Sequence, residues 1–151
     1  MRFRAYDEEN KAMVYSDKCP YEYTFNLDDG KVQCMVDCSY TDIFGDEHFD
    51  WKAIGDAEIC SEVKDVNGKE IYQGDIIKNG KEQIMEVRYG KYIMYCPVDD
   101  KMMENIGFYV VASGIYEDMP LGPTSEYAMI IGNIHENADL VVDAKYRSIY
   151  K

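Results

Sequence analysis

The stretch D-V-N-G-K-E-I-Y-Q-G-D-I-I, residues 65–77, contains two glycines six residues apart and an aspartate directly after the second. Asn67-Gly68 accommodates positive φ at both centres of a tight turn, so it predicts a hairpin between a strand near 59–63 and residues 70–72. Gly74 permits a backbone angle closed to other residues, and the Asp75 side chain can cap nearby amides before the next strand. The stretch predicts a folding motif rather than a catalytic loop.

Further turns follow this stretch at intervals of ten to twelve residues. Asn79-Gly80 predicts one turn and Gly90-Lys91 the next. The strand between them alternates in polarity, and the side chains predicted to point inward are Met85, Val87 and Tyr89. Short strands at this spacing are typical of a small, strongly bent antiparallel sheet and hence of a barrel.

The first 60 residues predict two more hairpins. Residues 2–6 pair with 12–15, and residues 21–27 pair with 32–40 across an Asp-Gly turn. The apolar face of the second hairpin consists of Tyr21, Tyr23, Phe25, Leu27, Val32, Cys34 and Val36. A two-stranded hairpin is marginal by itself, so either the rest of the chain, including the segment 41–60 that is predicted to be irregular, or a second copy of the chain covers this face.

The last third of the chain is less regular. Residues 97–107 predict a short helix or a loop, 108–116 and 126–134 predict buried strands, and the segment between these strands predicts an exposed loop. Three regions result. An N-terminal β-hairpin region spans 1–60, a barrel region spans 61–140, and a short helix or tail spans 141–151. The strand predicted at 1–6 either belongs to the first region or joins the barrel.

Composition and charge exclude several classes of protein. The chain has 151 residues, of which 29 are acidic and 16 basic, so its net charge is −13. We therefore expect no direct binding to nucleic acid, because such binding relies on neutralising phosphates. No apolar run is long enough to cross a membrane, and the first residues lack the apolar core of a secretory signal, so we expect a cytoplasmic protein.

Metal and catalytic sites are not predicted. The five cysteines form no C-x-x-C pair, and alternation places Cys34 and Cys38 about 13 Å apart along one strand, too far for one zinc ion. We interpret both as small core residues. His48 lies among carboxylates in G-D-E-H-F-D-W, which offers a general base or a site for a divalent ion, but 29 acidic residues make such proximity expected by chance. The glycines and lysine of G-K-E-I-Y-Q-G-D lack the spacing of a phosphate-binding loop.

Three segments in order, 3–15, 65–77 and 130–140, resemble the YopX family of phage and prophage proteins. The middle segment is the most specific, because nine of its residues match the family pattern. Gln73 stands where an acidic residue is more usual, Tyr6 replaces a common Trp, and Ala138 replaces a common Pro. Residues 19–55 and 96–126 show no family pattern, so any specialised role is expected to lie there.

The resemblance implies a fold but no reaction. It implies a mainly β protein, a small SH3-like antiparallel barrel with an added N-terminal β-hairpin region and little helix. It brings no catalytic motif, no cofactor and no metal ligand. The matching residues that we interpret as structural are Asn67, Gly68, Gly74, Asp75, Gly132 and Asn133.

The functional prediction is a non-enzymatic, phage- or prophage-encoded module that binds protein or takes part in a small assembly. The alternative is an acidic antagonist that acts on a nucleic-acid-binding protein of the host. Fourteen tyrosines and the hairpin face described above favour a homo-oligomer, and a host or phage protein is the other expected partner.

Overall fold

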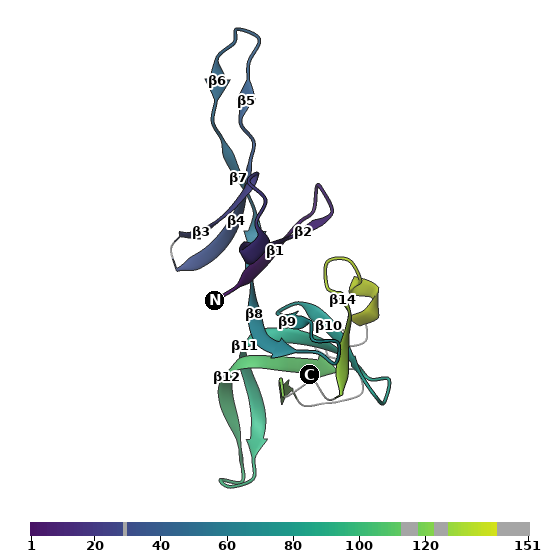
Figure 1. Cartoon of the computed structure of the whole chain (residues 1–151). Coiled ribbons are helices and arrows are strands. Elements are labelled where there is room, and N and C mark those ends of the chain that lie inside the picture. The colour runs from purple at the N-terminus through teal and green to yellow at the C-terminus, as the bar shows by residue number, and fades with distance from the viewer. Residues whose placement is uncertain (29, 113–117, 123–126, 142–151) are drawn as a thin grey trace. The chain divides into compact units, whose positions relative to one another are not determined.

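The computed structural model describes residues 1–28, 30–112, 118–122 and 127–141 (Figure 1). The chain divides into two compact units, unit 1 with residues 1–59 and unit 2 with residues 60–151. Antiparallel strands dominate both units, and the helical elements among the described residues are the single 3-10 turns η1 (Ser16–Lys18) and η3 (Ala138–Val141). The mainly β prediction is confirmed. The helix or tail predicted at 141–151 lies outside the described residues, apart from its first residue.

Unit 1 consists of two hairpins and a long extension. Its strands are β1 (Phe3–Asp7), β2 (Ala12–Tyr15), β3 (Tyr23–Asp28), β4 (Lys31–Asp37), β5 (Tyr40–Thr41), β6 (Glu47–His48) and β7 (Trp51–Asp56). β1 pairs with β2 and β3 with β4, as the sequence predicts, while β7 is the third strand beside β4. β1 also pairs with the first residues of β8 (Glu58–Lys64), a strand that continues into unit 2.

The core of unit 1 covers the second hairpin. Ala5, Val14 and Cys34 are buried together, and partly buried side chains pack around them, among them Tyr23, Phe25 and Ile54. Strands of the same unit therefore cover the centre of the hairpin face, while Tyr21 and Leu27 at its ends remain exposed. The prediction that 41–60 is irregular is wrong, because β7 lies there. Cys34 pairs with Gly55 and Met35 with Ala53, so β7 has one extra residue at this point. This bulge interrupts the alternation in β7, on which strand prediction depends. Cys38, interpreted as a core residue, is exposed.

Unit 2 contains a five-stranded antiparallel sheet that curls into a partial barrel (Figure 1). Its strands in spatial order are β13 (Met119–Pro120), β12 (Lys101–Ala112), β11 (Ile84–Cys96), β10 (Asp75–Asn79) and β14 (Ala128–Asn133). β8 forms the predicted hairpin with β9 (Glu70–Tyr72). The main buried cluster of this unit is Ile71, Ile77, Met85, Val87, Val110, Ala112 and Ala128.

The turn between β8 and β9 differs in detail from the prediction. Gly68 has a positive φ of 78°, but Asn67 is not among the residues with positive φ, so the predicted pair of positive angles is wrong. The turn has three residues between Asp65 and Lys69 instead of two, which moves the single left-handed position to the glycine. Asp65, which the sequence analysis did not single out, organises this turn. Its Oδ1 accepts hydrogen bonds from Asn67 N–H and Lys69 N–H, at 2.9 Å each.

Asp65 also joins this turn to the strand β14. Its Oδ2 accepts a hydrogen bond from the N–H of Ile130 at 3.0 Å, and the N–H of Val66 donates to the carbonyl of Ala128 at 2.9 Å. The side chain is buried, and burial raises the pKa of Asp65, but the three backbone hydrogen bonds outweigh burial and hold this pKa below its usual value of 3.8. One carboxylate therefore connects segments 65 residues apart in the chain.

Gly74 and Asp75 form the corner before β10. Gly74 has a φ of 89°, its N–H donates to Val87 and its carbonyl accepts from Ile134. Asp75 is buried, and its Oδ2 accepts a hydrogen bond from the N–H of Tyr72 at 2.8 Å. The corner thus combines a backbone angle suited to glycine with the side-chain cap expected from the sequence.

Gly132 and Asn133 lie opposite this corner, at the end of β14. Asn133 is paired with Asp75 across the sheet and Gly132 with Ile76. The Asn133 side chain accepts hydrogen bonds from the N–H groups of His135 and Glu136, which closes the turn after β14. A Cβ on Gly132 would lie 2.6 Å from Cγ of Asn137, so a larger residue here requires the Asn137 side chain to move.

The second half of the barrel region departs from the prediction. Gly90-Lys91 forms no turn, because it lies inside β11, a strand of 13 residues. β11 pairs with β12 on both sides of this position. The predicted short helix or loop at 97–107 is also wrong beyond the turn at 97–100, since β12 begins at Lys101. The glycines account for the first error. Gly90 and Gly107 are direct partners across the ladder, with φ of 148° and 156°, so they mark a bend within two strands rather than a connection between strands.

Of the three inward-pointing side chains predicted on β11, Met85 and Val87 are buried, whereas Tyr89 is 44% exposed. The prediction for Tyr89 is wrong because the core ends before the bend. No helix in the described part of the chain is long and apolar enough to span a membrane.

Candidate functional site

A long hairpin extends from β4 and β7 of unit 1 and ends in the short strands β5 and β6 (Figure 1). Its end bears large exposed apolar side chains: Ile43 is 93% exposed, Phe44 82% and Phe49 81%. Tyr40 and Trp51 flank them and are also exposed. We call residues 40–51 the aromatic tip. Neighbouring apolar side chains that reach solvent together mark a surface of interaction rather than ordinary exposure.

Asp42 organises the loop at the end of the aromatic tip through hydrogen bonds. Its Oδ1 accepts hydrogen bonds from the N–H groups of Phe44 and Asp46, at 2.9 and 3.0 Å, and its backbone bonds to Gly45 and Asp46 close the turn. His48 Nε2 lies 2.8 Å from Asp42 Oδ2, and the imidazole stacks on the ring of Tyr40 with centroids 4.7 Å apart. The hydrogen bond with His48, followed by those from the backbone, lowers the pKa of Asp42. The apolar side chains thus stand on a fixed loop.

The same loop occurs at two other places in the chain. In the loops 42–46, 65–69 and 79–83, the first residue is Asp or Asn, and its Oδ1 accepts from the N–H groups of the third and fifth residues. The first N–H donates to the fifth carbonyl, and the fourth N–H donates to the first carbonyl. The fourth residue has positive φ in every case, namely Gly45, Gly68 and Glu82. The loop geometry therefore specifies positions one and four.

Positions two and three of this loop are free of such requirements. They are Val66-Asn67 in the second loop and Gly80-Lys81 in the third, but Ile43-Phe44 in the aromatic tip. Leaving two large apolar side chains in water forgoes roughly 1.5–3 kcal/mol of burial for each. The other two loops form without Ile or Phe at these positions. The turn therefore does not require Ile43 or Phe44 in order to fold.

Charge gives the aromatic tip a second property. Residues 32–51 contain no Lys or Arg and five acidic residues, four of which belong to the tip: Asp42, Asp46, Glu47 and Asp50. Asp46, Glu47 and Asp50 are exposed. The tip therefore combines apolar contact area with a negative rim, and carboxylates of this kind favour contact with cationic groups.

The His48 cluster, which the sequence analysis weighed as a catalytic or metal site, takes a different form. Of its carboxylates, Asp42 contacts the imidazole, while Asp46, Glu47 and Asp50 are exposed. Across the described ranges, no group of three His, Cys, Asp or Glu side chains is placed to hold a metal ion. The described contacts of His48 are with Asp42 and Tyr40, so they connect residues within the tip.

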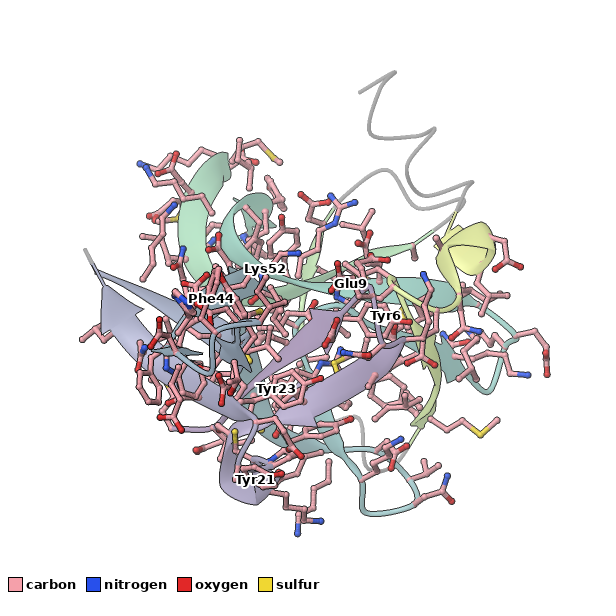
Figure 2. The ribbon with its side chains drawn as sticks, turned by 90° about the horizontal axis from the view of Figure 1, so that it is seen from above. Tyr6, Glu9, Tyr21, Tyr23, Phe44 and Lys52 are labelled. Carbon is pink, nitrogen blue, oxygen red and sulfur yellow. The ribbon has the colours of Figure 1, made fainter. Side chains whose placement is uncertain are left out.

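A polar network at the base of unit 1 positions the first hairpin. Asp7 Oδ2 accepts hydrogen bonds from the Tyr23 hydroxyl at 2.6 Å and from Asn10 Nδ2 at 2.7 Å. Burial raises the pKa of Asp7, but these bonds, together with backbone hydrogen bonds from Asn10 and Glu9, outweigh burial and lower it overall. Glu9 and Lys52 form an exposed ion pair at 3.2 Å, and Figure 2 shows both with Tyr23 and the exposed Tyr21 and Phe44. We interpret this network as structural, because each group in it has a partner.

A second exposed apolar surface lies in unit 2, where β11 and β12 continue beyond Gly90 and Gly107 as a two-stranded ribbon. Its exposed apolar side chains are Ile93, Tyr95, Val98, Met102, Met103 and Ile106. Neither surface is predicted from the sequence. At the aromatic tip a sequence pattern could have indicated the surface, because Ile43-Phe44 occupies turn positions that usually have polar residues. In the ribbon no pattern could have done so, because strand alternation does not show whether a core lies under the strand.

Comparison with known families identifies one match. The model of the family described as YopX protein matches residues 2–142, which is most of the chain and includes both exposed surfaces. No curated protein matches the chain.

Proposed function

We propose that the chain, which belongs to the YopX family, is a protein-binding module that inserts its aromatic tip into an apolar pocket of a partner protein. The observation that supports this proposal best is the contrast among the three equivalent loops, in which only the tip places Ile and Phe at the free positions. Exposed aromatic anchors on a preorganised loop are the usual centre of a protein interface. The proposal includes no enzymatic activity and places the module in the cytoplasm of a bacterial host of a phage or prophage.

The acidic rim favours a partner with Lys and Arg around the pocket. Asp46, Glu47 and Asp50 are exposed beside Phe49 and Phe44, so a basic rim would meet carboxylates as the aromatic side chains are buried. A nucleic-acid-binding protein offers such a rim, and for this reason the antagonist of a host nucleic-acid-binding protein is kept as the second candidate. The two candidates share the docking element and differ in the partner.

Capture from a bacterial lysate by the immobilised full chain tests the proposal. We expect the double variant Ile43→Ser/Phe44→Asn to lower affinity for a captured partner by about 30-fold or more, because truncating a central anchor typically removes at least ~2 kcal/mol of binding. Both substitutions keep Asp42 and Gly45, so the turn is retained. Higher salt should weaken capture, since the rim is exposed to screening.

Val66→Ser is the matched control, because Val66 occupies the same loop position in unit 2 and is also exposed. It should leave capture unchanged. Equal capture by the wild-type chain and the Ile43→Ser/Phe44→Asn variant would contradict the proposal. A partner lost with both variants would also contradict it, because the loss would then not be specific to the tip.

A further inference from the structure

The ribbon of β11 and β12 beyond Gly90 and Gly107 lacks the core that supports the rest of unit 2. The buried clusters of the unit end with Tyr109 and Phe108 on β12, and none of the residues 91–106 belongs to them. Within the described chain, residues 91–106 pair only with one another. Figure 1 shows both strands bending away from the curled sheet and ending in a free turn. A hairpin of two strands is marginally stable in water, so an uncovered ribbon of this length requires a cover.

One face of the ribbon carries four exposed apolar side chains and two charged ones. Register places Ile106 opposite Lys91, Glu104 opposite Ile93 and Met102 opposite Tyr95, and alternation puts all six side chains on the same side. The four apolar members are 41–70% exposed. The face continues toward the core through Tyr89, and the centroid of its ring lies 4.9 Å from the ring centroid of Phe108. We call this set the ribbon face.

The charges of the ribbon face are balanced, in contrast to the rest of the chain. Residues 89–108 contain two lysines and three acidic residues, a net charge of −1 out of −13 for the whole chain. The two charged side chains on the face are of opposite sign, and Lys91 Nζ lies 3.6 Å from Glu104 Oε1. A two-fold axis that passes between Lys91 and Glu104 would place the lysine of each copy near the glutamate of the other, so the face can be complementary to itself about that axis.

From these observations we propose that the ribbon face is the contact between two copies of this chain, which form a two-fold symmetric dimer by packing ribbon against ribbon. Two strongly acidic chains associate most readily where charge is lowest, and the aromatic tip, with four carboxylates and no cation, is disfavoured as such a contact. Packing the two ribbons face to face gives each the second layer that a sheet requires. The tip stays free for the partner proposed above, so the two inferences are independent.

Sedimentation velocity of the full chain, from about 1 to 100 µM, tests the dimer. We expect the mass to approach twice 17.5 kDa as concentration rises. The double variant Ile93→Thr/Ile106→Thr keeps β-branched residues in both strands but removes apolar contact, and should weaken dimerisation at least tenfold. Val98→Thr, at the 92% exposed turn position outside the face, should leave dimerisation unchanged.

Charge reversal supplies a second test that does not alter apolar packing. Lys91→Glu and Glu104→Lys should each weaken the dimer, and the two together should restore it, because the exchange preserves complementarity. A monomer mass at every concentration would overturn the proposal. A dimer that survives Ile93→Thr/Ile106→Thr, with far-UV circular dichroism like that of the wild type, would also overturn it, as would a dimer lost with Ile43→Ser/Phe44→Asn and not with the ribbon variants.

Discussion

Replacing Asp65 by Asn is expected to lower the free energy of unfolding by about 3 kcal/mol, because the buried carboxylate accepts three backbone hydrogen bonds and an amide offers only one oxygen. The amide NH2 would then face either the N–H of Ile130 or the N–H groups of the turn. Two donors facing each other in a buried site leave both unsatisfied, so the isosteric change is costly. Urea unfolding followed by circular dichroism measures the loss.

The contribution of the same carboxylate to stability should depend on pH. The pKa of Asp65 is lower in the folded chain than its usual value of 3.8, so its contribution to stability is present in full above that value and is lost as pH falls through the folded pKa. The stability difference between wild type and Asp65→Asn should therefore shrink below about pH 4. A difference that stays constant down to pH 2 would contradict the assigned hydrogen bonds.

Asp42→Asn is the matched control, because Asp42 makes the same two backbone contacts in an exposed loop. Its Oδ2 contacts an exposed imidazole instead of the N–H of a distant strand. Water can replace what the amide loses there, so the effect on stability should be clearly smaller than that of Asp65→Asn. Equal losses would mean that the loop alone, and not its link to β14, sets the cost.

Gly74→Val is expected to destabilise the chain by roughly 1–3 kcal/mol, because a β-branched residue would be forced to a φ of 89°. Both backbone groups of Gly74 are hydrogen-bonded, to Val87 and to Ile134, so the corner has no freedom to relax to another angle. Thermal and urea unfolding of the full chain measure the effect.

Gly80→Val tests whether the backbone angle is the cause. Gly80 lies in an exposed turn, has no positive φ, and a Cβ there meets nothing within 4 Å. The substitution should change stability by less than about 0.5 kcal/mol. If Gly80→Val and Gly74→Val destabilise equally, the loss comes from turn composition or strand propensity and not from the angle at Gly74.

Local chemistry allowed much of the fold to be predicted. Gly68, Gly74 and Asp75 act within a few residues of themselves, through backbone angles and short-range caps, and such effects are visible in any sequence. The N-terminal hairpins were predictable for the same reason, since strict alternation on both sides of a turn depends on no distant residue. The elements that were predicted wrongly are those where a bulge or paired glycines interrupt the pattern, such as β7 and the bend in β11.

The sequence by itself determined the β class, the antiparallel hairpins, the left-handed corners and the acidic charge, because each depends on neighbouring residues or on composition. Only the tertiary structure decided which apolar side chains have a cover. Met85 and Ile93 both lie on β11 and both fit its alternation, yet Met85 is buried and Ile93 is 53% exposed. Burial depends on what lies across the sheet, and alternation records only the direction of a side chain. The candidate surfaces therefore appeared with the fold: two apolar stretches that the described part of the chain leaves exposed.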